Sequence, residues 1–273
     1  MHGLGNDFVM LDLISNPIDV SPDQIRALAD RRFGVGCDQV LLIEPPSEAN
    51  VDFNYRIYNQ DGSEVEHCGN GARCFATFVR DKGLTTKNVI RVKTVNRILE
   101  LRCNDEGLVS VDMGSPELTP EHIPLTAAQR ALSYTRNITV NGQQQEIEFS
   151  ALSMGNPHAV VIVEDLEKTA VKEIGEALGN HGDFPEGVNV GFMEILSRDE
   201  IRLRVFERGA GETLACGTGA CAAVVAGCLL ERLNDSVKVQ LRGGELRIDW
   251  AGGDAPVVMT GPTTTVYEGT IDL

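Results

Sequence analysis

Several features are scarce or missing in this chain, and each absence narrows the class of protein. No apolar run approaches the length of a membrane span. The first residues, MHGLGND, do not place an apolar core after a basic region, so they do not resemble a secretory signal. Lys and Arg number only 24 against 40 Asp and Glu, which gives a net charge of −16. Such a charge argues against nucleic acid or an anionic membrane as a partner.

The cysteines lack the spacing of a disulfide framework or a zinc site. Their number is seven, which is odd, and this favours thiols in a reducing cytoplasm. No C-x-x-C pair occurs around Cys68 or Cys216, and no pair of histidines accompanies them, so we expect no metal. The other five are expected to be small hydrophobic residues of the core: Cys37, Cys74, Cys103, Cys221 and Cys228.

What the chain does contain is one motif that occurs twice. The pattern E-x-x-x-C-G-x-G-A spans residues 64–72 and 212–220, and its cysteines, Cys68 and Cys216, lie 216 − 68 = 148 residues apart. Three more pairs of segments recur in the same order: 5–7 with 155–157, 39–44 with 189–194, and 113–116 with 259–262. A solenoid would show shorter periods and more copies. The repeat therefore predicts two homologous domains.

The boundary between these domains is predicted in the Pro-rich segment Gly114–Pro120. Residues 1–114 form the N-terminal half and residues 115–262 the C-terminal half. The last segment, 263–273, extends past the repeat, and we expect it to return to the first half.

The local pattern predicts an α+β fold. A capping box at 21–24 starts a helix that ends before Gly34, and residues 170–178 fill the equivalent place in the second half. Alternating segments predict strands at 51–58, 89–93, 201–206, 237–241 and 245–250, the last two joined by a turn at 242–244. Runs of small and apolar residues at 72–79 and 220–230 predict buried helices. Each half is then a curved, barrel-like, mostly antiparallel sheet wrapped around one helix, because helices are too few to cross over between strands.

A cysteine at the start of such a helix is suited to acid–base chemistry. The helix N-terminus presents backbone N–H groups and positive charge, which lower a thiol pKa from about 8.5 toward roughly 3.5–7.5. The flanking glycines leave room for a substrate carboxylate on those N–H groups, which places the thiol beside an α-carbon. Two such thiols can invert that carbon without a cofactor, since one removes the proton and the other returns it from the opposite face.

A structural interpretation of the same residues stays open at this point. A shared ancestor could preserve a Gly-rich cap around a core cysteine as readily as a catalyst. His67 is interpreted only as a neighbour of Cys68, since the repeat has Ala215 there. His158, in a polar turn, could be a surface histidine, and Glu207-Arg208 could be an exposed pair at a strand end.

Further segments extend the pattern over nearly the whole chain: 1–8, Asn59 with 61–64, 68–74, 153–158 and 207–220. Together they closely resemble the diaminopimelate epimerase family, cofactor-independent isomerases that interconvert L,L- and meso-diaminopimelate on the way to lysine and peptidoglycan. The resemblance implies a fold of two pseudo-symmetric domains. It also implies a cytoplasmic homodimer, with Tyr267 at the dimer contact, and neither cofactor nor metal.

The resemblance assigns roles residue by residue. Cys68 and Cys216 are the two acid–base residues, and His158 and Glu207 modulate their pKa values. The positions that match substrate-binding residues of the family are Asn6, Gln39, Asn59, Gly69, Asn70, Asn156, Asn189, Glu207, Arg208, Gly217 and Thr218.

Three other functions remain as alternatives. A proline or hydroxyproline racemase of the same fold would also use paired cysteines, but Asn6, Asn156 and Glu207-Arg208 fit a substrate with two amino acid ends better. A binding protein that has lost its chemistry would normally have lost one cysteine. A thiol–disulfide redox protein would need a C-x-x-C partner at the helix cap.

Overall fold

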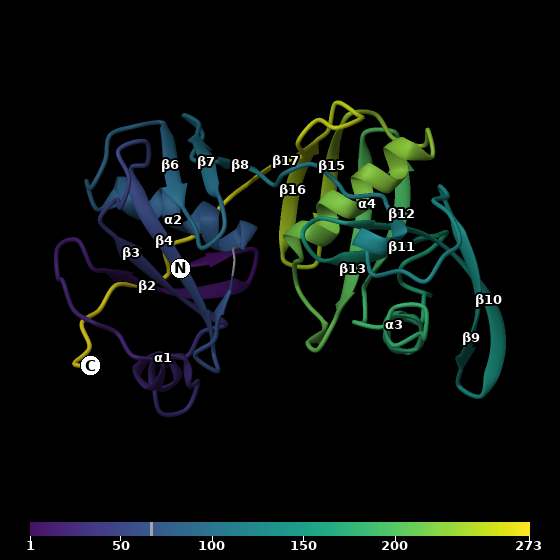
Figure 1. Ribbon diagram of the computed structural model, residues 1–273, viewed down its shortest axis with the longest axis horizontal. Coiled ribbons are helices and arrows are strands. Elements are labelled where there is room, and N and C mark those ends of the chain that lie inside the picture. The colour runs from purple at the N-terminus through teal and green to yellow at the C-terminus, as the bar shows by residue number, and fades with distance from the viewer. Residues whose placement is uncertain (66–67) are drawn as a thin grey trace. The chain divides into compact units, whose positions relative to one another are not determined.

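The computed structural model describes residues 1–65 and 68–273, and the chain folds into two compact units (Figure 1). Unit 1 comprises Met1–Asp112 and Thr260–Leu273, and unit 2 comprises Met113–Met259. Glu66 and His67, the latter interpreted above as a neighbour of Cys68, lie outside the described residues. No helix in the described part of the chain is long and apolar enough to cross a membrane.

In the described part of unit 1, eight strands and two helices precede the final segment. They are β1 (His2–Gly3), β2 (Asn6–Asp12), α1 (Pro22–Ala29), β3 (Gln39–Glu44), β4 (Phe53–Asn59), β5 (Glu64–Val65), α2 (Gly69–Asp81), β6 (Val89–Lys93), β7 (Ile98–Cys103) and β8 (Val109–Asp112). The final segment binds back to the start of the chain, since the backbone of His2 pairs with that of Thr264.

Unit 2 repeats this order after a short 3-10 helix and a long hairpin. Its elements are η1 (Pro120–His122), β9 (Tyr134–Val140), β10 (Gln143–Ser153), β11 (Pro157–Val163), α3 (Val171–Gly179), β12 (Asn189–Ser197), β13 (Glu200–Glu207), β14 (Gly211–Glu212), α4 (Gly217–Leu229), β15 (Ser236–Leu241), β16 (Gly244–Asp249) and β17 (Val258–Gly261). The last two residues of β17 already belong to unit 1. From β2 to β8 and from β11 to β17 the sequence of strands and helices is the same.

Most strand pairs are antiparallel, as predicted, but the structure also has parallel pairs. Within the described residues these are β2–β3, β4–β6, β11–β12 and β13–β15. The connections between the paired strands contain α1, α2, α3 and α4, respectively. The prediction that helices are too few for crossovers was therefore wrong. Each helix makes one crossover, and the sheets are mixed.

Each sheet is covered on both faces, which explains its long buried strands. In unit 1, Val40 and Leu42 of β3 pack with Ile25 and Leu28 of α1. Leu41, between them, is fully buried on the opposite face, the side on which α2 contacts β3. A strand covered on both sides carries apolar residues without alternation.

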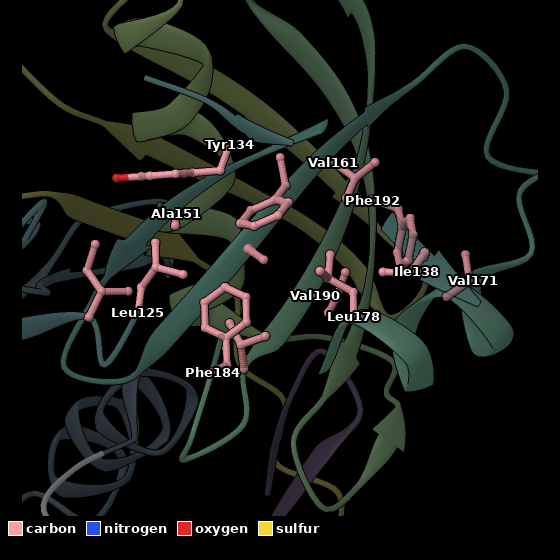
Figure 2. Packing of buried hydrophobic residues seen from close by; sticks show 14 of the residues in the cluster. Leu125, Tyr134, Ile138, Ala151, Val161, Val171, Leu178, Phe184, Val190 and Phe192 are labelled. Atoms are coloured by element: carbon pink, nitrogen blue, oxygen red, sulfur yellow. The ribbon is translucent and has the colours of Figure 1, made fainter. Parts of the chain in front are cut away.

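The core of unit 2 has the same two layers. On one side, Val171 and Leu178 of α3 pack against Val190 and Phe192 of β12, within a cluster that also contains Tyr134 (Figure 2). On the other side lies α4, whose residues from Ala220 to Gly227 are all buried. A helix that is apolar all round must be surrounded, and α4 contacts β10, β11, β12, β13 and β16.

The local signals of the sequence are confirmed closely. Ser21 caps α1, its Oγ accepts from the Gln24 N–H at 3.3 Å, and the reciprocal bond of the capping box is present. The predicted strand 89–93 is β6, and the predicted turn at 242–244 joins β15 to β16. The buried helices begin at Gly69 and Gly217, so a cysteine precedes each of them.

Candidate active site

In unit 1 the backbone places Cys68 as the N-cap residue of α2. Its φ of −138° and ψ of 122° are extended, and its carbonyl accepts the Ala72 N–H at 2.8 Å. The side chain makes no capping hydrogen bond. Instead the thiol donates to Asn6 Oδ1, with an Sγ–Oδ1 distance of 3.6 Å.

Around this thiol the predicted polar residues of unit 1 form two hydrogen-bonded groups. Asn70 Nδ2 donates to the same Asn6 Oδ1 at 3.3 Å, and Asn6 Nδ2 donates to Asp38 Oδ2 at 2.9 Å. Separately, Gln39 Nε2 donates to Asn59 Oδ1 at 2.9 Å across β3 and β4. Most of the polar side chains in these two groups are therefore neutral amides.

Unit 2 places Cys216 at the same position of α4, with a charged neighbour. Cys216 is the N-cap residue, and its side chain is only 5% exposed. The thiol donates to Glu207 Oε2 at 3.1 Å, and Thr218 Oγ1 lies 3.6 Å from Sγ. The second carboxylate oxygen, Oε1, accepts from Thr213 Oγ1 at 2.5 Å. Glu207 is thus held with one oxygen facing the sulfur.

The electrostatics of Cys216 differ from the expectation for a helix cap. Burial raises the pKa of this thiol well above its usual value, and the Glu207 carboxylate raises it further. Hydrogen bonds with Thr218 and Gly219 act in the opposite direction and do not compensate. The prediction of a lowered pKa was wrong for Cys216, because burial outweighs the helix terminus.

Arg208 and Asn189 form a second polar group at the end of β13. Asn189 Oδ1 accepts the backbone N–H of Arg208 at 2.9 Å, and Asn189 Nδ2 donates to the Pro157 carbonyl at 3.1 Å. The Arg208 guanidinium donates to the Glu186 carbonyl at 2.7 Å and is exposed. It therefore retains donors that can bind a carboxylate.

His158 is buried, which excludes the surface interpretation. It is 1% exposed, and its Nε2 lies 3.0 Å from Asn156 Oδ1. Burial, with a smaller effect of Arg208, lowers the pKa of His158 to about 3, so the ring is neutral. Since the amide oxygen takes the Nε2 proton, Nδ1 is an acceptor, and it is buried without a hydrogen-bond partner among the described residues.

The remaining cysteines agree only in part with a core role. Cys37 and Cys74 are buried, and burial raises their pKa values to about 11 and about 12. Cys221 is also buried. Cys103 and Cys228 are half-buried, and the Cys228 thiol donates to the Asn234 carbonyl at 3.1 Å. Tyr267 in the final segment is 65% exposed.

Three residues near the thiols were not foreseen. Asp38 contacts Asn6, Thr213 contacts Glu207, and Tyr55 donates to the Cys68 carbonyl at 3.4 Å. The available signal was position, because Asp38 precedes Gln39 and Thr213 lies inside the repeated motif. Within residues 1–65 and 68–273, no group of three or more His, Cys, Asp or Glu side chains could hold a metal ion.

Comparison with known proteins adds independent information. The family model described as "Diaminopimelate epimerase" matches residues 1–119 and 150–266. The chain is similar over its whole length to the diaminopimelate epimerase of Thioalkalivibrio sulfidiphilus, with 57% identity and 98% of that protein covered. It is 56% identical to that of Nitrosomonas europaea, again over the whole chain and 98% of the relative.

Solved structures with much lower identity share the fold. A hydroxyproline epimerase from Agrobacterium vitis, with bound trans-4-hydroxy-L-proline, aligns with a TM-score of 0.66 at 19% identity, over 96% of this chain and 87% of that one. A PhzF-family phenazine biosynthesis protein from Bacillus anthracis aligns with a TM-score of 0.65 at 15% identity, over 96% and 92%. The two neighbours show that this fold is shared at low sequence identity.

Proposed function

Because the chain belongs to the diaminopimelate epimerase family, we propose that it interconverts L,L- and meso-2,6-diaminopimelate by proton transfer between two thiols at one α-carbon. The observation that carries the proposal is the equivalent placement of Cys68 and Cys216, each the N-cap residue of a buried helix. The chemistry requires both thiols to reach the same carbon from opposite faces. One thiolate removes the proton, and the opposite thiol protonates the resulting carbanion.

The proton of Cys216 has a direct acceptor in Glu207. The resting thiol, whose pKa is raised, donates to Glu207 Oε2 at 3.1 Å. Transfer along this hydrogen bond converts thiol and carboxylate into thiolate and carboxylic acid without changing the total charge. The thiolate then takes the α-proton, and the Cys68 thiol supplies a proton to the other face. After one inversion Cys216 is a thiol and Cys68 a thiolate, ready for the reverse reaction.

The substrate's charged groups have complementary partners. The N–H groups at the starts of α2 and α4 can bind the carboxylate next to the reacting carbon and stabilise the charge that develops there. Arg208, whose guanidinium is exposed, pairs with the carboxylate at the distal end in this proposal. The amide oxygens of Asn and Gln side chains can accept hydrogen bonds from the substrate's ammonium groups. The matching positions that carry such amides are Asn6, Gln39, Asn59, Asn70, Asn156 and Asn189.

The family resemblance also implies cofactor independence, a cytoplasmic location and a homodimer, and we propose these properties here. The enzyme works without a cofactor, in the cytoplasm, as a homodimer in which Tyr267 lies at the contact. Its side chain is 65% exposed in the single chain, which leaves it available for a second copy. Sedimentation of the protein with and without Tyr267→Ala tests this arrangement.

The decisive experiment is incubation with meso-diaminopimelate in D₂O without added cofactor. We expect the L,L isomer to form and solvent deuterium to enter at one α-carbon. Cys68→Ala and Cys216→Ala should each abolish inversion, because each removes the acid–base group on one face. Cys103→Ala, a half-buried cysteine outside both caps, is the control and should retain activity.

A racemase for proline or hydroxyproline is the second candidate, supported by the fold shared with the Agrobacterium vitis enzyme. Parallel incubations with both amino acids decide between the two. Deuterium in proline or hydroxyproline, but not in diaminopimelate, would overturn the proposed substrate while keeping the two-thiol mechanism.

A further inference from the structure

The Cys68 thiol faces the oxygen of an amide whose orientation decides the state of the sulfur. Asn6 Oδ1 lies 3.6 Å from Sγ and accepts its hydrogen bond. An amide turned by 180° would present Nδ2 instead, and an N–H group stabilises a thiolate rather than a thiol. The orientation of Asn6 therefore affects which protonation state of Cys68 is stabilised. Two charged residues outside the predicted site, Asp38 and Arg73, favour the observed orientation.

Asp38 fixes one end of Asn6. As an ionised carboxylate it can only accept, and its Oδ2 receives Asn6 Nδ2 at 2.9 Å and the backbone N–H of Asp7 at 3.1 Å. Its other oxygen, Oδ1, pairs with the Arg31 guanidinium at 2.7 Å. With both oxygens used as acceptors, Asp38 favours Nδ2 of Asn6 on its side, and this leaves Oδ1 for the thiol.

Arg73 fixes the other partner of the same oxygen. A guanidinium can only donate, and Arg73 NH2 donates to Asn70 Oδ1 at 2.9 Å in a fully buried position. Asn70 must then present Nδ2 to its next neighbour, which is Asn6 Oδ1 at 3.3 Å. Both charged residues thus favour the same orientation of Asn6, from opposite ends of one hydrogen-bonded chain.

The repeat shows that the fold itself does not require these residues. Using the offsets of 150 and 148, Asp38 corresponds to Val188, Asn70 to Thr218 and Arg73 to Cys221. In unit 2 two apolar side chains and one hydroxyl serve the same structural positions, and there the thiol donates to a carboxylate instead. Because these two charged residues occur only in unit 1, they indicate a role that is specific to Cys68.

We propose that Asp38 and Arg73 are positioning residues that hold an amide oxygen, and not an amide N–H, against the Cys68 thiol. The effect is to favour the protonated form of Cys68, so that it meets a carbanion as an acid. This consequence for turnover rests on the proposed function. The orientation of the amide does not rest on the proposed function, since its effect on the pKa of Cys68 can be measured without substrate.

The test is the pH dependence of iodoacetamide alkylation of Cys68 without substrate, followed by peptide mass spectrometry. In Arg73→Met, loss of a nearby cation by itself would raise the pKa of Cys68, because a cation favours the thiolate. The variant also frees Asn70 to turn its oxygen toward Asn6, which weakens the hold on Asn6 Oδ1 and acts in the opposite direction. We expect the pKa to fall by about one unit, which is about tenfold faster alkylation at neutral pH. Arg73→Lys retains a donor-only group and should behave as the wild type.

A second pair of variants keeps the test decisive if Arg73→Met does not fold. Asp38→Ala and Asp7→Ala each remove one carboxylate from the Arg31 network, but only Asp38 accepts from the side chain of Asn6. We expect the pKa of Cys68 to fall more in Asp38→Ala, by about one further unit. Alkylation of Cys216 in the same samples is the internal control and should not change.

Two results would overturn the proposal. One is a raised or unchanged pKa of Cys68 in folded Arg73→Met, and the other is an equal shift in Asp38→Ala and Asp7→Ala. Deuterium exchange on diaminopimelate with the wild-type enzyme is measured separately. Its absence would reject the proposed function while the alkylation data still decided the orientation of Asn6.

Discussion

The two halves of this protein share one scaffold, but their cysteine thiols lie in different electrostatic environments. Arg56 pairs with Glu64 through two hydrogen bonds, of 2.8 and 3.1 Å, and 148 residues later Arg204 pairs with Glu212 through bonds of 2.7 and 2.9 Å. The parallel register of β2 with β3 recurs as that of β11 with β12. These repeated contacts hold each cap in place.

The hydrogen-bond partners of the two thiols differ. Cys68 donates to the amide of Asn6, whereas Cys216 donates to the carboxylate of Glu207. By the same offsets, Asn59 corresponds to Glu207, Phe8 to His158, and Val65 to Thr213. Duplication thus supplied two thiols in equivalent places, and substitutions around them made two different acids.

Removing the carboxylate of unit 2 should have the largest effect. Glu207→Gln gives Cys216 a neutral neighbour, as in unit 1, and removes the acceptor of its proton. We expect kcat to fall by about 100-fold or more, in the range typical of general acid–base groups. At the same time the pKa of Cys216 should fall, because the carboxylate that disfavours its thiolate is gone. Steady-state kinetics and the pH dependence of alkylation measure the two effects.

The combination of slower turnover with a more acidic thiol distinguishes this explanation from a general loss of structure. Glu146→Gln, which makes the same charge change at an exposed position of β10, is the control and should alter neither quantity. A slower enzyme whose Cys216 pKa is unchanged would contradict the assigned role of Glu207.

Exchanging His158 for the residue of the other half should change the pH dependence of stability. The folded-state pKa of His158 is about 3, below the usual 6.5. As the pH falls below 6.5, His158 is therefore protonated in the unfolded chain but not in the folded chain, and this destabilises the folded state. From pH 7 to pH 5 this costs about 2 kcal/mol of unfolding free energy. His158→Phe should lose this part of the acid sensitivity, as measured by urea unfolding at both pH values.

All other titrating groups remain in both proteins, so the difference between them isolates His158. Phe8 shows that an apolar ring is compatible with this position of the fold, since it is 3% exposed. Equal losses of stability in wild type and variant between pH 7 and pH 5 would show that His158 is not held neutral.

The smallest effect is expected at Thr213, which touches Glu207 but has no proton to transfer to the substrate. Thr213→Val places the residue of unit 1 there and removes the hydrogen bond to Oε1. Loss of one such bond is worth about 1 kcal/mol, so kcat should fall by roughly three- to tenfold. KM should not change, because Thr213 positions Glu207 and does not bind the substrate.

The reciprocal variant sharpens this last comparison. Val65→Thr introduces a hydroxyl in unit 1, where the position of Glu207 is occupied by Asn59, and we expect less than a twofold change in kcat. A larger effect of Val65→Thr than of Thr213→Val would contradict the assigned asymmetry between the two caps.

Much of this arrangement could be predicted from the sequence, because the signals are local. The capping box at Ser21 and the small-residue runs after Cys68 and Cys216 depend on neighbours within one turn of helix. The repeat then supplied the correspondence between halves. What could not be predicted depends on distant contacts, since Asn6 meets Asp38 across 32 residues and Asn70 across 64.

The raised pKa of Cys216 was hidden for the same reason. The two motifs are almost identical around their cysteines, and the local argument from the helix terminus applies equally to both. Burial at 5% exposure and the approach of Glu207 arise from packing over a longer range. The parallel crossovers are not visible in the sequence pattern, because a buried helix has the same apolar signal whether or not it also connects two parallel strands.

The return of the last segment to unit 1 has a consequence for the order in which the chain can fold during synthesis. Thr260–Leu273 belongs to unit 1, and Thr264 pairs with His2. A ribosome releases these residues last, whereas domains normally fold as they emerge, the N-terminal one first. Unit 2, which ends at Met259, can be complete while the first unit still waits for its final partner. The half that is made first is therefore the half that is finished last.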